Sequence, residues 1–135
     1  MEIEHHKKLS ASGALPLVTE ASLFLYNANY LSDESIAWAY DDEVICATLN
    51  ESLIGIMTFI DYDDESQIFI KISYVKFEFR GQGIHGKMYA MLKDIARERG
   101  IKYIRSGVHI DNTEMQDHLE KQGRKRCAII YEDVI

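Results

Sequence analysis

Eight residues in the second half of the chain, 80–87, read Arg-Gly-Gln-Gly-Ile-His-Gly-Lys and separate two segments of different hydrophobic period. The segment before them is rich in β-branched and aromatic residues, and the segment after them has apolar residues at helical spacing. Glycines let consecutive N–H groups turn toward one anion, and the start of a helix adds free N–H groups and a positive dipole end. The pattern therefore predicts an α/β fold with a phosphate site at a strand-to-helix junction.

Three known phosphate-binding motifs share these letters. Gly81-x-Gly83-x-x-Gly86 fits the dinucleotide fingerprint, but that fold requires repeated strand-helix-strand units, whereas a run of antiparallel strands precedes this loop. Gly81-x4-Gly86-Lys87 fits a Walker A loop, but Met88 stands where Ser or Thr should bind magnesium, and a hard cation prefers oxygen ligands. The sequence context therefore favours a third pattern, Arg80-x-x-Gly83.

Hydrophobic patterning predicts the order of elements along 135 residues, which we expect to form one domain, 1–135, without a linker. Strands are expected at residues 2–8, 44–49, 53–60, 67–77, 102–110 and 126–131. Helices are expected from residue 15 to about 30, at 86–99 and at 112–122, with Asp111 or Asn112 capping the last one. Residues 32–42 fit either a short helix or a strand.

The region from about residue 44 onward resembles the GNAT superfamily of acyl-CoA N-acetyltransferases. Residues 75–84 read Val-Lys-Phe-Glu-Phe-Arg-Gly-Gln-Gly-Ile, which is similar to that family's Val-x-Pro-x-x-Arg-Gly-x-Gly-Ile pattern, with Phe77 at the usual proline. Asn112 and Gly123 have the spacing of the family's next helix. The resemblance covers about residues 44–130 and implies an α/β (α+β) fold, with a mixed, mostly antiparallel central sheet and helices on both faces.

The resemblance also implies acetyl-CoA as acyl donor. The backbone of residues 74–77 would pair with the pantetheine arm as an added strand, and the N–H groups of 81–87 would hold the pyrophosphate. Lys87 and Arg80 would add positive charge, and Asn112 would hydrogen-bond the arm near its thiol. The cofactor-binding residues expected on this basis are Tyr74, Val75, Phe77, Arg80, Gly81, Gln82, Gly83, Ile84, His85, Gly86, Lys87 and Asn112.

Acyl transfer from a thioester to an amine requires a neutral amine, a positioned carbonyl and a proton for the departing thiolate. Where the family often has a tyrosine acid, seven residues after the asparagine, this chain has Leu119, and where it often has a glutamate base, this chain has Lys71 and Ile72. His109 and His118 are the candidate catalytic residues, because histidine has the intrinsic pKa for proton transfer.

Two functions stay open at this point. One is an N-acetyltransferase acting by direct attack on the primary amine of a small cationic molecule, or on a protein lysine or N-terminus. The other is a catalytically weak or inactive acyl-CoA sensor or interaction module on the same fold.

Charge is divided along the chain. Residues 68–126 hold 13 Lys and Arg against 7 Asp and Glu, a net of +6, while the remaining residues hold 2 basic and 15 acidic ones, a net of −13. The basic segment fits an anionic cofactor, and the acidic turn at 61–65 fits a cationic amine substrate. The overall charge of −7 and the lack of an aromatic stacking pattern argue against nucleic acid as a partner.

The remaining features bear on location and assembly. Cys46 and Cys127 lack disulfide-framework and metal-ligand spacing, so we expect reduced, packed cysteines in a cytoplasmic protein without a metal site. The first residues lack a signal-peptide core, and the longest apolar runs are strand-sized, which argues against export or membrane insertion. The family commonly has a second strand after the one expected at 126–131, and only residues 132–135 follow it here, so the resemblance implies an open sheet edge that a second subunit could cover, and a homodimer is expected.

Overall fold

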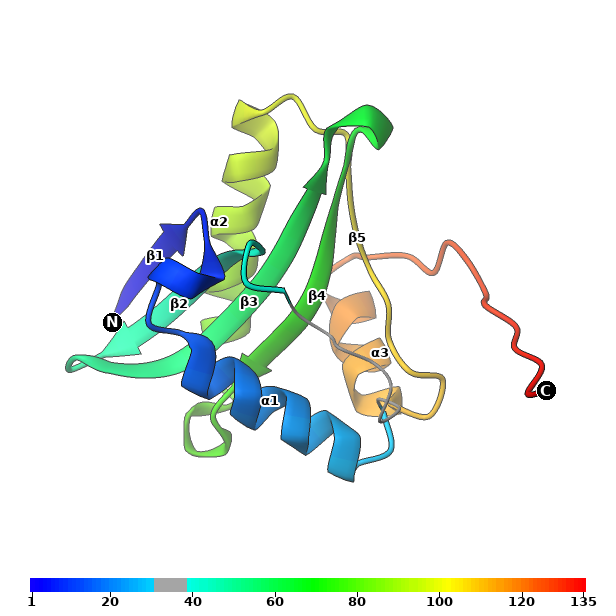
Figure 1. The fold of residues 1–135 in the computed structure, drawn as a ribbon, viewed down its shortest axis with the longest axis horizontal. Helices are drawn as coiled ribbons and strands as arrows, with labels where there is room; N and C mark the ends of the chain where they lie inside the picture. The colour runs from blue at the N-terminus through cyan, green and yellow to red at the C-terminus, as the bar shows by residue number, and fades with distance from the viewer. Residues whose placement is uncertain (31–38) are drawn as a thin grey trace.

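A computed structural model describes residues 1–30 and 39–135, and these residues form one five-stranded sheet in the order β1-β2-β3-β4-β5 (Figure 1). Neighbouring strands are antiparallel except β4 and β5, which are parallel. The strands are β1 (Glu2–His6), β2 (Glu43–Leu49), β3 (Ser52–Tyr62), β4 (Gln67–Val75) and β5 (Tyr103–Ser106). The expected antiparallel run before the glycine loop is confirmed, while residues 31–38 of the ambiguous segment lie outside the described residues.

Helices cover both faces of the sheet, as expected. The three are α1 (Leu15–Asn27), α2 (Ile84–Glu98) and α3 (Thr113–Lys121) in the described part of the chain. On one face, α1 buries Leu17 and Val18 against Ile56 and its neighbours. On the other, α2 buries Met88 and Leu92 in a second cluster. Full burial of one such side chain is worth about 1.5–3 kcal/mol. Met88 is thus a core residue, and Met91 packs against the same cluster while only partly buried.

β4 contains a bulge beside the point where it leaves β5. Thr58 of β3 faces Ile72 and the next residue of β3 faces Ile70, so Lys71 has no opposite partner. The Ile72 N–H donates to Oγ1 of Thr58 at 3.1 Å, and Lys71 Nζ lies 2.9 Å from the buried carboxylate of Asp42. Bulges bend a strand and re-aim its side chains, and here the bulge sits where pairing with β5 ends.

Two predicted strands differ in the structure. The strand expected at 102–110 is confirmed only over β5, because the chain turns away from β4 after Ser106. The strand expected at 126–131 is wrong: these residues have no strand partner within the described chain, and Ile130 is 93% exposed. The apolar pattern predicts an extended segment, but a β-strand also needs a neighbouring strand to pair with. The pattern does not show whether such a strand is present.

The two cysteines also differ from expectation. Cys46 is buried in β2, where burial and then the Glu4 carboxylate raise the pKa of its thiol to about 11. Cys127 is exposed in the extended C-terminal segment, so the prediction that it packs is wrong. Within residues 1–30 and 39–135, none of the helices has the length and apolar character needed to cross a bilayer.

Candidate active site

A cleft opens where β4 and β5 diverge. The two strands pair from Gln67↔Tyr103 to Ile70↔Ser106 and then separate, while β4 continues for another five residues. A cavity of about 100 Å³ lies in this gap, closed by the start of α2 and by α3. Its lining residues are Leu25, Tyr30, Ile70, Lys71, Ile72, Ser73, His85, Ser106, Gly107, Val108, His109, Asn112, Met115, Leu119 and Arg124.

The outer edge of β4 is open along this cleft. Residues 72–75 pair with β3 on one side, and no strand pairs with the other side of residues 71–75 in the described structure. Tyr74 and Val75 belong to this edge, as expected. Phe77 does not, because it begins a single turn of 3-10 helix and its side chain is 79% exposed. The edge available to an added strand is therefore 71–75, earlier than the 74–77 expected.

The glycine loop ends at the start of α2 with its N–H groups unused. Gly81 and Gly83 have φ of +79° and +77°, conformations that other residues adopt only under strain. The N–H groups of residues 81–86 have no hydrogen-bond partner in the described part of the chain, and no side chain caps α2. The N–H of Lys87 is not available, since it donates to the Gly83 carbonyl at 3.1 Å. The loop thus presents six free donors rather than the seven expected.

Arg80, expected to add charge to the loop, makes its side-chain contacts with β4, α1 and Phe77. Its Nε donates to the Val75 carbonyl at 2.9 Å. Its guanidinium lies 5.2 Å from the ring centre of Phe24, 5.3 Å from Tyr74 and 5.7 Å from Phe77. Contacts of this kind hold a guanidinium on aromatic faces, so Arg80 fastens the end of β4 to α1.

Asn112 caps α3 and keeps part of its amide free. Its Oδ1 accepts a hydrogen bond from the Met115 N–H at 3.2 Å, so Asn112, and not Asp111, is the cap. Because only the oxygen is used, both Nδ2 hydrogens remain available toward the cleft that Asn112 lines.

His109 lines the same cleft. Its Nδ1 accepts a hydrogen bond from the Asp111 N–H at 3.1 Å, and its ring lies 5.6 Å from that of Tyr30. A backbone N–H can only donate, so the neutral imidazole must carry its proton on Nε2. His109 therefore presents a hydrogen-bond donor.

His118 is absent from the lining of the cleft. It lies on α3 directly before Leu119, which does line the cleft, and its Nε2 is 3.0 Å from Nδ1 of His85. Gln122 also contacts that Nδ1, at 3.1 Å. Burial, His118 and Arg124 lower the pKa of His85 to about 4, so this residue is neutral near pH 7. The two candidate histidines thus have different environments, one in the cleft and one against the loop.

Several lining residues escaped the sequence analysis. Arg124 Nη2 donates to Oγ of Ser106 at 2.8 Å and its guanidinium lies 5.0 Å from the Tyr89 ring. Tyr30 comes from just beyond α1, and only its position in the folded chain brings it to the cleft. None of the described lining residues is Asp or Glu, and the described chain has no group of three or more potential metal ligands.

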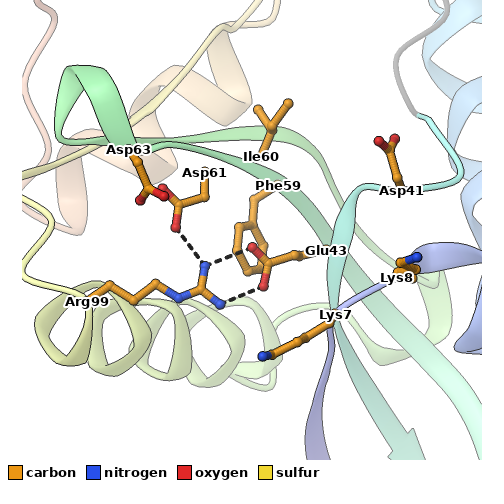
Figure 2. Close-up of a pocket in the computed structure, with 9 residues that line it drawn as sticks. All are labelled: Lys7, Lys8, Asp41, Glu43, Phe59, Ile60, Asp61, Asp63 and Arg99. Atoms are coloured by element: carbon orange, nitrogen blue, oxygen red, sulfur yellow. Dashed lines mark hydrogen bonds and ion pairs between the residues drawn. The ribbon is translucent and has the colours of Figure 1, made fainter.

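A second, larger concavity of about 730 Å³ lies at the other end of α2 (Figure 2). Arg99 projects into it and contacts Glu43 through both ends of its guanidinium, at 2.7 and 2.8 Å, and Asp61 at 2.8 Å. Figure 2 shows Asp63 beside Asp61. The acidic turn at 61–65 therefore borders this groove, and none of its residues lines the cleft that it was expected to serve.

Comparison with known proteins agrees with this geometry. The "Acetyltransferase (GNAT) family" profile matches residues 16–123. A ribosomal-protein-alanine N-acetyltransferase from Brucella melitensis biovar Abortus 2308 has a similar structure at 19% identity, with 100% of this chain and 99% of that chain covered and a TM-score of 0.69.

Two further solved structures are similar. The aminoglycoside N-acetyltransferase AAC(6')-Iy in complex with CoA shares 16% identity, with 99% of this chain and 100% of that chain covered and a TM-score of 0.67. An integron cassette protein from the mobile metagenome of V. cholerae shares 20%, with 99% and 93% covered and a TM-score of 0.71. No curated protein sequence matches. Because the family profile spans most of the chain, this protein belongs to the GNAT acetyltransferase family.

Proposed function

We propose that the protein transfers an acetyl group from acetyl-CoA to a primary amine, by direct attack of the amine in a ternary complex. The observation that carries the proposal is the open edge of β4, which leads along the cleft to a loop with six free N–H groups at the start of α2. An open edge fits an extended chain with amide groups, and the loop fits a diphosphate.

The chain's own residues fit this cofactor. Residues 71–75 would hold the pantetheine arm, and the N–H groups of 81–86 would hold the pyrophosphate, with Lys87 on the same helix turn. A Cβ atom added at Gly81, Gly83 or Gly86 would meet nothing within 4 Å, so the space directly beside the loop backbone is open. The free Nδ2 of Asn112 would donate to the arm. When bound, acetyl-CoA supplies the thioester whose acetyl group is transferred.

His109 is the residue we assign to the chemistry. With Nδ1 occupied by the Asp111 N–H, its neutral ring offers Nε2–H as a fixed donor to the negative charge that develops at the acetyl group. Loss of one such donor typically lowers kcat by about 10² to 10³. His118 does not itself line the cleft but contacts His85, which does, so its position supports a role in holding α3 against the loop.

The acceptor is proposed to be a small cationic amine, or a lysine or N-terminus of a protein. The similar structures include an enzyme named for ribosomal protein alanine and others named for aminoglycosides. No described lining residue is a carboxylate base, so the amine would lose its proton to water. Turnover should then rise with pH toward the pKa of an alkylamine, near ~10.

Calorimetric titration with acetyl-CoA, followed by thiol release with a panel of amines, tests the proposal. The panel should contain an aminoglycoside, a polyamine and a peptide with an N-terminal alanine. His109→Gln should lower kcat about 10²-fold or more and leave the affinity for acetyl-CoA within about threefold. His118→Gln serves as the comparison and should leave kcat much less affected. Absence of acetyl-CoA binding at millimolar concentration would refute the cofactor assignment.

One observation favours a second function. Leu119 lines the cleft and stands where the family often has its tyrosine acid, so this position offers no proton. A chain that binds acyl-CoA as a sensor would show saturable binding in the titration and no thiol release with any amine of the panel.

A further inference from the structure

Lys71 lies at the inner end of the proposed cofactor cleft. It is the first residue of β4 beyond the pairing with β5, so it begins the open edge 71–75 at the end farthest from the glycine loop. Lys71 lines the cleft, and no other described lining residue is a lysine. An acyl-CoA with its pyrophosphate at the loop and its arm along this edge would bring its thioester toward Lys71.

The bulge in β4 allows a lysine to stand at this position. Ile70 packs in the core cluster under α2, and Ile72 packs in the cluster under α1. In a regular strand, positions two apart share one face, so the bulge is what places these two residues on opposite faces. Lys71 is the additional residue between them, and its amine contacts Asp42 instead of either cluster.

A buried carboxylate holds the Lys71 amine. Nζ lies 2.9 Å from Oδ1 of Asp42, whose side chain is only 1% exposed. The other carboxylate oxygen, Oδ2, accepts a hydrogen bond from the Ala39 N–H at 2.6 Å, which fixes the carboxylate in place. The Lys71 side chain is 23% exposed, so it is not sealed in the core. A proton can pass directly between two groups at this separation.

Lys71 and Asp42 together supply an acceptor amine and a base. We propose that the protein acetylates its own Lys71, which rests on the proposed use of acetyl-CoA. Nζ gives one proton to Asp42 and attacks the thioester carbonyl carbon, so that the N–C bond forms and the C–S bond breaks. The departing thiolate takes a second proton from Nζ. The products are an amide, a neutral carboxyl group and a free thiol, and no charge is left buried without a partner.

The modification acts on the cleft itself. The acetyl group stays on Nζ at the inner end of a cavity of about 100 Å³, and the positive charge of Lys71 is lost. Each chain should therefore be modified once and should bind acetyl-CoA more weakly afterwards. Because the amine and the bound thioester belong to one complex, the rate at saturating acetyl-CoA should not depend on protein concentration.

Labelling without any added amine tests the proposal on the whole chain. The protein is incubated with acetyl-CoA that carries an isotopically labelled acetyl group, and intact mass and peptide mapping follow the label. Lys71 should be labelled about 10-fold or more faster than the exposed Lys125, which reports uncatalysed acetylation. Equal labelling of the two lysines, or no label at Lys71, would overturn the proposal.

The loop variant Gly83→Asp separates this proposal from the proposed function. It keeps Lys71 and removes the proposed pyrophosphate site, so it should lose the label at Lys71 and keep the slow label at Lys125. Lys71 labelling that persists at the parent rate in this variant would refute acetylation from the cleft. If calorimetry shows that the parent binds acetyl-CoA and Lys71 stays unlabelled, only the self-acetylation is wrong. If the parent does not bind acetyl-CoA, the cofactor assignment fails as well.

A matched pair of substitutions tests the base. Asp42→Asn can still accept the Ala39 N–H but takes up no proton, so it should slow Lys71 labelling about 10²-fold. Asp41→Asn makes the same change at an exposed neighbour and should leave the rate within about twofold. Equal labelling rates in these two variants would refute the proton transfer to Asp42.

Lys71→Arg provides a test that leaves Asp42 and its cation in place. It should reduce the label on the whole chain to the slow background of the exposed lysines, and it should keep the acetyl-CoA affinity of the parent within about threefold. Circular dichroism of this variant should match that of the parent. Fast labelling that continues at another lysine would show that Lys71 is not the acceptor.

Discussion

Helix α2 has a concavity at each end, and the two ends differ in how their polar groups are partnered. At the N-terminal end, the N–H groups of 81–86 have no partner in the described chain, and His85 is half-buried and neutral near pH 7. At the C-terminal end, Arg99 binds Glu43 and Asp61 within 2.8 Å (Figure 2). Both ends carry a glycine of positive φ, Gly83 at +77° and Gly100 at +67°.

The pKa shifts at the C-terminal end describe one guanidinium shared between two carboxylates that differ in environment. Burial opposes ionisation of Glu43, but hydrogen bonds from Arg99 and His5 lower its pKa. Burial, aided by Asp63, raises the pKa of Asp61 in spite of Arg99. The hydrogen bond to Glu43 raises the pKa of Arg99 further. The cation at the centre of the larger concavity, Arg99, thus already has two carboxylate partners, which fits a role in folding, whereas the loop at the other end presents N–H donors without partners in the described chain.

The largest predicted effect is a difference in acetyl-CoA affinity between substitutions of Gly83 and Gly100. Gly83→Asp should weaken acetyl-CoA binding about 100-fold or more, because it strains the loop and places a negative charge beside the proposed pyrophosphate site. Gly100→Asp introduces the same side chain at a similar φ, and neither position has an atom within 4 Å of the added Cβ. It should leave the affinity within about twofold. Calorimetry with acetyl-CoA measures both variants.

Chemical denaturation of the same two variants provides the control. Both should lose roughly 1–2 kcal/mol of unfolding free energy from the left-handed backbone. If Gly83→Asp retained the parent affinity, or if the two variants lost affinity equally, the contrast between the ends of α2 would be wrong.

Much of the fold could be predicted from local sequence patterns. The change of period at residues 80–87 located the loop, and Gly100 marked the end of α2. The antiparallel strands before the loop were predictable because each alternates over a few residues and ends at a polar turn. The cap at Asn112 was also within reach, because caps depend on residues three positions apart.

Features that depend on distant residues were not predictable. The bulge at Lys71 involves Thr58 and Asp42, and no local pattern connects these three positions. His118 contacts His85 because one side of α3 faces the loop at the start of α2. That contact depends on how the two helices are placed relative to each other. The wrong prediction of a strand at 126–131 has the same cause. The residues have a strand-like composition, but the described chain offers them no strand to pair with.

The second effect concerns His85 and pH. Its pKa of about 4 in the folded chain lies below the ordinary 6.5, so the unfolded chain binds the extra proton first. Its contribution to stability is therefore complete above pH 6.5 and is lost as the pH falls to about 4. Linkage puts the loss at about 3 kcal/mol. Urea unfolding from pH 4 to 7.5 should show this slope in the parent and not in His85→Gln.

His6→Gln is the comparison, because it changes the same residue type at the partly exposed end of β1, away from α2. Its profile should follow the parent. If the unfolding free energies of the parent and His85→Gln had the same pH dependence, protonation of His85 would not be disfavoured in the folded chain. The contrast between the two ends of α2 would then weaken.

The smallest effect is at Arg99. Arg99→Met should lower the unfolding free energy by about 1–2 kcal/mol, because Glu43 and Asp61, each about 15% exposed or less, lose their shared cation. Arg97→Met lies on the same helix turn but breaks only an exposed pair with Asp94, and should cost less than about 0.5 kcal/mol. Neither variant should change acetyl-CoA affinity. Weaker acetyl-CoA binding in Arg99→Met, but not in Arg97→Met, would instead make the charged groove part of the active site. Charges that only stabilise the fold should not change the affinity for a ligand at the opposite end of α2.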